Sequence, residues 1–216
     1  MNRTDRLVTG WSAVAGGALS LAMVALYFVY SGPPPEANVL SRNLITLATF
    51  TAFLVFAVGL GRLLRSEAGD AGLTGELATA ALRTYVVVTL VAASLEVGTS
   101  LQHPDGSLDP TVDGPLAAGM VLLHGPVARV LVAAFLTGLA TAPAAARLFS
   151  SRVRRGSIAL AALNLAMVPS LFFGMHAASF YASNGWGSVA SMGAINVIWF
   201  VVLGRAVLRS DRLAAA

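Results

Sequence analysis

Residues 77–101 read LATAALRTYVVVTLVAASLEVGTSL, and only Arg83 and Glu96 in this run carry a charge. The run exceeds the about 20 residues that a helix needs to cross the hydrocarbon core of a bilayer. Alanine, leucine and valine dominate it, and no proline interrupts it. This stretch therefore predicts a transmembrane helix.

Five further stretches have the same apolar character, namely residues 7–30, 44–61, 118–146, 157–183 and 189–207. Hydrophobic residues make up 56% of the 216-residue chain and charged residues 11%. A soluble domain carries about 25% charged residues, so this composition excludes a water-soluble globule. We predict a single domain over residues 1–216, an all-α six-helix transmembrane bundle whose main partner is the lipid bilayer.

The composition also excludes several kinds of chemistry. The chain has no cysteine, which removes disulfides, thiol nucleophiles and thiolate metal sites. It has no lysine either, since all its basic residues are arginine, so no Schiff base can form on it. No P-loop, dinucleotide fingerprint or nucleophile elbow is present. We expect no nucleic-acid partner, because the net charge of +4 reflects membrane orientation.

The arginines predict that orientation. Eleven of the 14 lie before the first stretch, after the second, between the fourth and fifth, or at the end of the sixth and beyond it. Arg42 is assigned to a connection on the opposite side, and Arg83 and Arg129 fall within stretches. Positive residues concentrate on the cytoplasmic side. We therefore predict a multi-pass protein of the bacterial cytoplasmic (inner) membrane with both termini in the cytoplasm.

Ionisable residues on three stretches are expected near one depth. Glu96, His124, Arg129 and His176 each lie ~27 to 35 Å from the cytoplasmic anchor of their helix, at 1.5 Å per residue. On the third stretch and just past its end, four other polar residues share a face of about 60° with Glu96. They are Tyr85, Thr89, Ser100 and His103. This stripe predicts a face that looks into the bundle or into an outward-facing polar pocket.

Three interpretations of Glu96 stay open. It forms a buried ion pair with Arg129 that sets helix register, it acts as a proton-accepting carboxylate or ligand anchor, or it reaches toward the interface. As a catalytic group it would serve as general acid or base. In a ligand pocket, Arg129, His124 and His176 would supply charge and hydrogen bonds. Tyr85, Thr89 and Ser100 would line the same pocket.

The two histidines carry a further hypothesis. His124 and His176 suit axial haem ligation, or zinc if a carboxylate joins them. Histidines that hydrogen-bond to loops are the alternative, so the cofactor stays unknown. Asn164 and Asn196 each lie nine residues from a cytoplasmic arginine on consecutive stretches. We predict that they form a structural hydrogen bond between helices.

In span number and spacing the chain resembles bacterial families of small six-helix integral membrane proteins whose function is unknown. The run from Leu122 to Arg155, a helix with polar residues followed by an arginine-rich turn, carries the closest likeness. No site residue follows from it. Three functions are expected as alternatives: binding or transport of a small amphipathic or lipid-like ligand, an intramembrane enzyme acting on a lipid or isoprenoid, and an accessory subunit of a membrane complex.

Overall fold

The computed structural model describes residues 2–30, 32–103 and 105–213, and these contain helices and no strand. Its elements follow the chain as α1 (Arg3–Leu26), α2 (Glu36–Ala68), α3 (Gly72–Gln102), α4 (Gly114–Leu122), α5 (Ala128–Thr141), α6 (Ala145–Leu148), α7 (Ser151–Ala166) and α8 (Met192–Leu213). A π-helical turn, η1 (Leu123–Val127), joins α4 to α5. A 3₁₀ turn, η2 (Val168–Phe173), follows α7, and a second π-helical turn, η3 (Gly187–Ser191), precedes α8.

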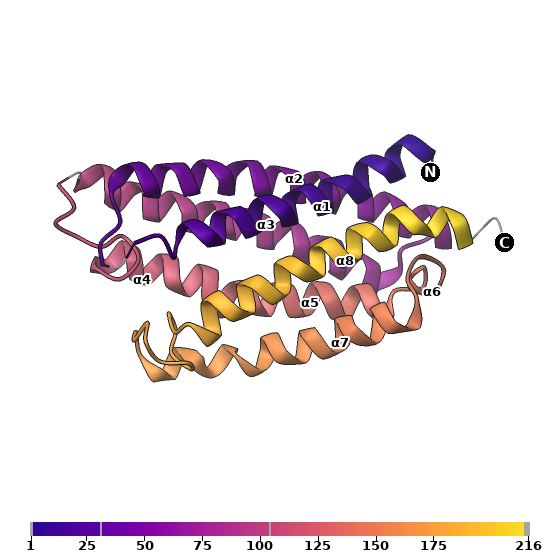
Figure 1. Cartoon of the computed structure of the whole chain (residues 1–216). Coiled ribbons are helices and arrows are strands. Elements are labelled where there is room, and N and C mark those ends of the chain that lie inside the picture. The colour runs from indigo at the N-terminus through magenta and orange to yellow at the C-terminus, as the bar shows by residue number, and fades with distance from the viewer. Residues whose placement is uncertain (1, 31, 104, 214–216) are drawn as a thin grey trace.

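Six helical segments are long and apolar enough to cross a membrane. They are Arg3–Leu26, Glu36–Ala68, Gly72–Gln102, Gly114–Thr141, Ser151–Phe173 and Gly187–Ser210. The predicted all-α bundle with six such helices is confirmed. In Figure 1 the two termini lie at the same end of the bundle, with α8 beside α1. We call this the terminal end, and the end where α3 finishes and α4 begins the distal end.

The packing order differs from the chain order. α1 packs against α2 and α8, α3 against α2 and α5, and α5 against α7. Aromatic rings fill the centre, where Phe53 stacks on Phe200 with ring centroids 4.4 Å apart. Phe200 also stacks on Tyr85 and Phe135. The ring of Tyr85 therefore belongs to the central core of the bundle.

The second helix begins eight residues before the predicted stretch. α2 starts at Glu36, directly after three consecutive prolines, and continues to Ala68. Proline is compatible with the start of a helix, because the first helical N–H groups need no partner within the helix. Arg42 therefore lies inside α2 and not in a connection, which corrects its predicted place.

The fourth stretch contains a break that the sequence marks with Pro126. Proline lacks the N–H that an α-helix requires, and here Gly125 leaves helical geometry with φ −88 and ψ −110. The helix then ends at Thr141, because Ala142 is extended (ψ 144) ahead of Pro143. Arg129 is thus 12 residues, or about 18 Å, from the terminal end of α5, and not the predicted ~27 Å from an anchor.

The fifth span, predicted within residues 157–183, has different bounds in the structure, where the helical segment runs over Ser151–Phe173. α7 ends at Ala166, and the chain continues as η2, in which Pro169 cannot donate to a carbonyl of the preceding turn. Gly174 then takes the left-handed conformation (φ +68), which favours glycine. Residues 174–186 form turns that fold back onto the bundle, with Ser183 N–H donating to Gly174 O at 2.9 Å.

Candidate functional site

Glu96 is bound on both carboxylate oxygens by side chains of its own chain. It lies on α3 near the distal end and is 1% exposed. Oε1 forms an ion pair with Arg42 of α2, and Oε2 accepts a 2.8 Å hydrogen bond from Asn43 Nδ2. The Tyr27 hydroxyl, just after α1, donates to the same carboxylate at 3.2 and 3.3 Å. Three helices are tied together at this carboxylate.

A second set of contacts holds Arg42 in place. Its Nη1 donates to Asn38 Oδ1 at 3.2 Å, and its guanidinium carbon lies 4.1 Å from the centre of the Tyr27 ring. Asn38 donates in turn to the Leu26 carbonyl at 3.3 Å. We call Tyr27, Asn38, Arg42, Asn43 and Glu96 the Glu96 cluster. Its two buried charges are paired with each other and hydrogen-bonded, which is the condition under which burial of charge is tolerated, and only Arg42 Nε is left without a hydrogen-bond partner among the described residues of the cluster.

The ion pair considered between Glu96 and Arg129 is not formed. Arg42 takes the place at Glu96 because α2 begins early enough to carry it to the level of the carboxylate. Arg129 on α5 is 3% exposed, and its Nε and Nη1 atoms have no hydrogen-bond partner among the described residues. A buried guanidinium with open donors is costly, since an uncompensated charge loses its hydration.

Arg129 lies where the irregular segments of the bundle meet. A Cβ placed on Gly125 would lie 3.4 Å from Arg129 Nη1 and 3.5 Å from Ser183 O, so these groups are close neighbours. The Ser183 hydroxyl donates to Ser170 O of η2 at 3.4 Å, and the Ser170 hydroxyl itself is buried without a partner among the described residues. We call Gly125, Arg129, Ser170 and Ser183 the Arg129 site. Its arginine has open donors, and among the described residues Ser170 is connected to this arginine only through the contacts of Ser183 and Gly125.

The inward face predicted for α3 is confirmed. Thr89, Glu96 and Ser100 are buried, with exposures of 3%, 1% and 7%. Thr89 Oγ1 donates to the Tyr85 carbonyl at 2.9 Å, so its hydroxyl is used within the helix. The Tyr85 ring packs on Phe50 and Phe200. This face serves the packing of the bundle along its length and reaches a charged cluster at its distal end.

The two histidines lie in different environments. His124 is half-buried on η1, and its Nδ1 is 3.4 Å from Met120 Sδ. His176 is exposed in the turns after η2, beside Gly174. Within the described ranges no group of three or more His, Asp or Glu side chains could hold a metal ion. The zinc set of two histidines and a carboxylate is therefore not assembled, and axial haem ligation stays a prediction.

The predicted asparagine pair is confirmed. Asn164 Nδ2 donates to Asn196 Oδ1 at 2.9 Å, and Asn196 Nδ2 donates back to Asn164 Oδ1 at 3.0 Å. Asn164 is fully buried and Asn196 is 9% exposed. The pair joins α7 to α8 through two reciprocal bonds, as the equal distance of each residue from a basic anchor predicts.

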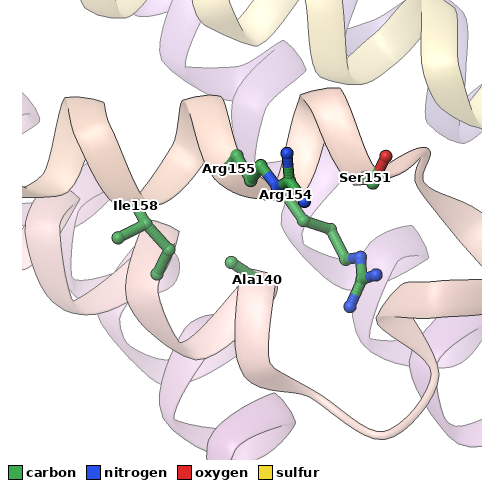
Figure 2. Close-up of a pocket in the computed structure, with 5 residues that line it drawn as sticks. All are labelled: Ala140, Ser151, Arg154, Arg155 and Ile158. Carbon is green, nitrogen blue, oxygen red and sulfur yellow. The ribbon is translucent and has the colours of Figure 1, made fainter.

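A cavity of about 380 Å³ that is widely open at the surface lies at the terminal end, away from both polar sites. Figure 2 shows its lining residues on the first turns of α7 and the end of α5, namely Ala140, Ser151, Arg154, Arg155 and Ile158. None of these residues was singled out as a site residue from the sequence. The sequence feature that could have identified them is the spacing of three and four residues along α7, which places side chains on one helix face.

Four members of the Glu96 cluster were also missed as site residues. Tyr27, Asn38, Arg42 and Asn43 all lie close to the three prolines that precede α2. Asn38 and Arg42 are four residues apart, a spacing that brings side chains together on a helix. Starting the second helix directly after Pro35 would have revealed this pair and placed Arg42 at the level of Glu96.

No protein-family model, curated protein or solved structure matches this chain. We therefore infer function from the chemistry of the Glu96 cluster, the Arg129 site and the cavity at α7.

Proposed function

We propose that this chain is a multi-pass protein of the bacterial cytoplasmic membrane, with both termini in the cytoplasm, that binds a small amphipathic or lipid-like ligand. The ligand carries an anionic head, such as a carboxylate, which Arg129 holds. The six apolar helical segments support the membrane assignment. The arginine-rich connections and both termini share the terminal end, which supports the orientation.

The observation that carries the ligand proposal is the buried guanidinium of Arg129 with two open donors. A carboxylate or phosphate oxygen pair fits a guanidinium in bidentate fashion, and the bond strengthens where water is excluded. No acidic residue occurs in the sequence between Asp113 and Asp211, so the elements from α4 to residue 210 offer Arg129 no countercharge. On α3, which packs against α5, Glu96 is already paired with Arg42. An anionic ligand would supply that charge from outside the chain.

The head is assigned to Arg129 and not to Glu96 because both oxygens of Glu96 already accept hydrogen bonds. The same contacts weaken the case for Glu96 as a general acid or base, since its oxygens already contact Arg42, Asn43 and Tyr27. In this proposal the Glu96 cluster holds the distal ends of α1, α2 and α3 together. Glu96 is then a positioning residue for the fold.

The apolar part of the ligand has a place beside the broken fifth span. Phe172 and Phe173 of η2 are 82% and 58% exposed, and Phe180 is 47% exposed. These rings face the surroundings of the bundle, where an acyl chain would pack on them. The 3₁₀ turn η2 and Gly174 interrupt the helical wall of the bundle here. In this proposal the ligand reaches Arg129 from the bilayer at this interruption.

The test uses oleate as the anionic probe and oleyl alcohol as its neutral analogue. The protein is purified in dodecyl maltoside and stripped of lipid, and its thermal unfolding is followed with each probe. We expect oleate to raise the unfolding temperature and oleyl alcohol to leave it near the starting value, because a ligand that binds only the folded state stabilises it. Arg129→Gln should abolish the oleate response.

Arg83→Gln is the matched control, because Arg83 is an exposed arginine on α3 outside the Arg129 site. It should keep the full oleate response. An equal stabilisation by oleate and oleyl alcohol, or an unchanged response in Arg129→Gln, would show that no anionic head is recognised at this arginine. The accessory-subunit alternative would then be favoured, with the buried polar groups serving the fold alone.

A further inference from the structure

The cavity of about 380 Å³ at the terminal end has two arginines in its wall and no acidic residue (Figure 2). Arg154 Nε is buried without a hydrogen-bond partner among the described residues. No ion pair or side-chain hydrogen bond of Arg154 or Arg155 is formed within the described part of the chain. The two guanidinium groups that line the cavity therefore have no ion-pair partner among the described residues, and the cavity is large enough for a lipid headgroup.

The acidic residues nearby do not neutralise this charge. Glu67 pairs with Arg6 at 3.0 Å, and Glu76 pairs with Arg65 at 3.2 Å. The α5–α7 region that builds the cavity lies in the part of the sequence without Asp or Glu. A ligand in the cavity would thus meet two guanidinium groups that form no ion pair with a described carboxylate.

The lining has an order from polar to apolar along α7. Ser151, Arg154 and Arg155 occupy the first turn and the start of the second, and Ile158 follows one turn later on the same face. Ala140 of α5 lies opposite, and the side chains of Arg154 and Ile158 extend from α7 on the side where Ala140 lies (Figure 2). Ile158 is 42% exposed, so the apolar side of the cavity is continuous with the outside of the bundle.

We infer that this cavity binds the phosphodiester headgroup of an anionic glycerophospholipid from the cytoplasmic leaflet. Arg154 and Arg155 hold the phosphate, and the first part of an acyl chain runs past Ala140 and Ile158. A phospholipid has the same order as the lining, an anionic phosphate followed by hydrocarbon. Basic pockets between helices on the cytoplasmic side are a recurring form of lipid recognition. The inference rests on the membrane orientation proposed above, but not on a ligand at Arg129.

The experiment measures binding of dioctanoyl phosphatidylglycerol to the full chain in dodecyl maltoside by native mass spectrometry. Dioctanoyl phosphatidylcholine tests whether net negative charge is needed, and inorganic phosphate tests whether a free anion suffices. We expect phosphatidylglycerol to bind and the other two to bind at least roughly tenfold more weakly, because charge and hydrocarbon both contribute.

Three variants locate the site. Arg154→Gln combined with Arg155→Gln should weaken phosphatidylglycerol binding roughly tenfold or more. Ala140→Trp should weaken it similarly by filling the cavity while both arginines remain. Arg152→Gln is the matched control, since Arg152 is an exposed arginine of the same helical turn that does not line the cavity, and it should bind within about twofold of the parent. Unchanged thermal unfolding of each variant shows that it is folded.

Two results would overturn the inference. Equal weakening by Arg152→Gln would show general surface attraction and no site, and equal binding of inorganic phosphate would assign the cavity to a free anion. Arg129→Gln should leave phosphatidylglycerol binding unchanged, while the Arg154 and Arg155 double variant should keep the oleate response. The experiment therefore tests the lipid site at Arg154 and Arg155 separately from the ligand site at Arg129.

Discussion

Glu96 on α3 and Arg42 on α2 form an ion pair in which both side chains are almost completely buried, at 1% and 2% exposure. The pair has further hydrogen-bond donors and acceptors from Asn38, Asn43 and Tyr27. Such an arrangement makes each charge dependent on the other, since removal of one leaves its partner buried and uncompensated. The distal end of the bundle is therefore held by electrostatics as well as by packing.

Glu96→Gln should destabilise the fold strongly. The substitution leaves the Arg42 charge without its carboxylate, at a cost of about 3–5 kcal/mol in the free energy of unfolding. Chemical unfolding in detergent, followed by circular dichroism, measures this loss. Glu76→Gln is the control, because its partner Arg65 and Glu76 itself are about half exposed. Loss of that exposed pair should cost about 0–1 kcal/mol. Similar losses in the two variants would contradict the role assigned to the Glu96 cluster.

Arg129→Met and Arg42→Met should have opposite effects on the lipid-stripped protein. Methionine fills similar space without charge, so at position 129 it removes an uncompensated cation and should raise stability by about 1–3 kcal/mol. At position 42 methionine leaves the buried Glu96 carboxylate without its ion-pair partner and should lower the free energy of unfolding by about 3–5 kcal/mol. Thermal unfolding compares both variants with the parent. A destabilised Arg129→Met variant would mean that the guanidinium has a partner within the fold.

Asn164 and Asn196 should couple by a modest energy. The two reciprocal bonds join α7 to α8, and hydrogen bonds between helices in membranes contribute about 0.5–2 kcal/mol. In a double-mutant cycle of Asn164→Leu and Asn196→Leu, the double variant should lose less stability than the two single losses together. Each single variant leaves one amide buried without its partner, and the double variant removes both. Strictly additive losses would contradict the coupling.

The orientation predicts different accessibility for two exposed serines. Ser66 lies near the terminal end of α2, and Ser107 lies in the connection after α3 at the distal end. Because the chain has no cysteine, a single Ser66→Cys or Ser107→Cys variant carries one thiol on a clean background. In intact bacterial cells a membrane-impermeant maleimide should label Ser107→Cys and leave Ser66→Cys unlabelled until the cells are permeabilised. The reverse pattern would place the termini outside.

Hydrophobic pattern alone determined the architecture of this protein. Apolar stretches of about 20 residues predict six helices because buried backbone groups in an apolar bundle must be satisfied within each helix. The inward face of α3 and the bond between Asn164 and Asn196 follow from the same regularity, since residue spacing along a straight helix gives both direction and depth. Each of these features depends on one helix or on two helices with clear anchors.

Tertiary structure decided which polar groups meet. Arg42, not Arg129, pairs with Glu96, because α2 begins at Glu36 and packs against α3, and neither fact is visible in hydropathy. Arg129 is left with open donors because Pro126 and Pro169 break the helices around it and change depth and direction by amounts that a count of residues misses. Pairing within a bundle depends on differences of a few ångströms in helix ends and crossings, which only the packed structure defines.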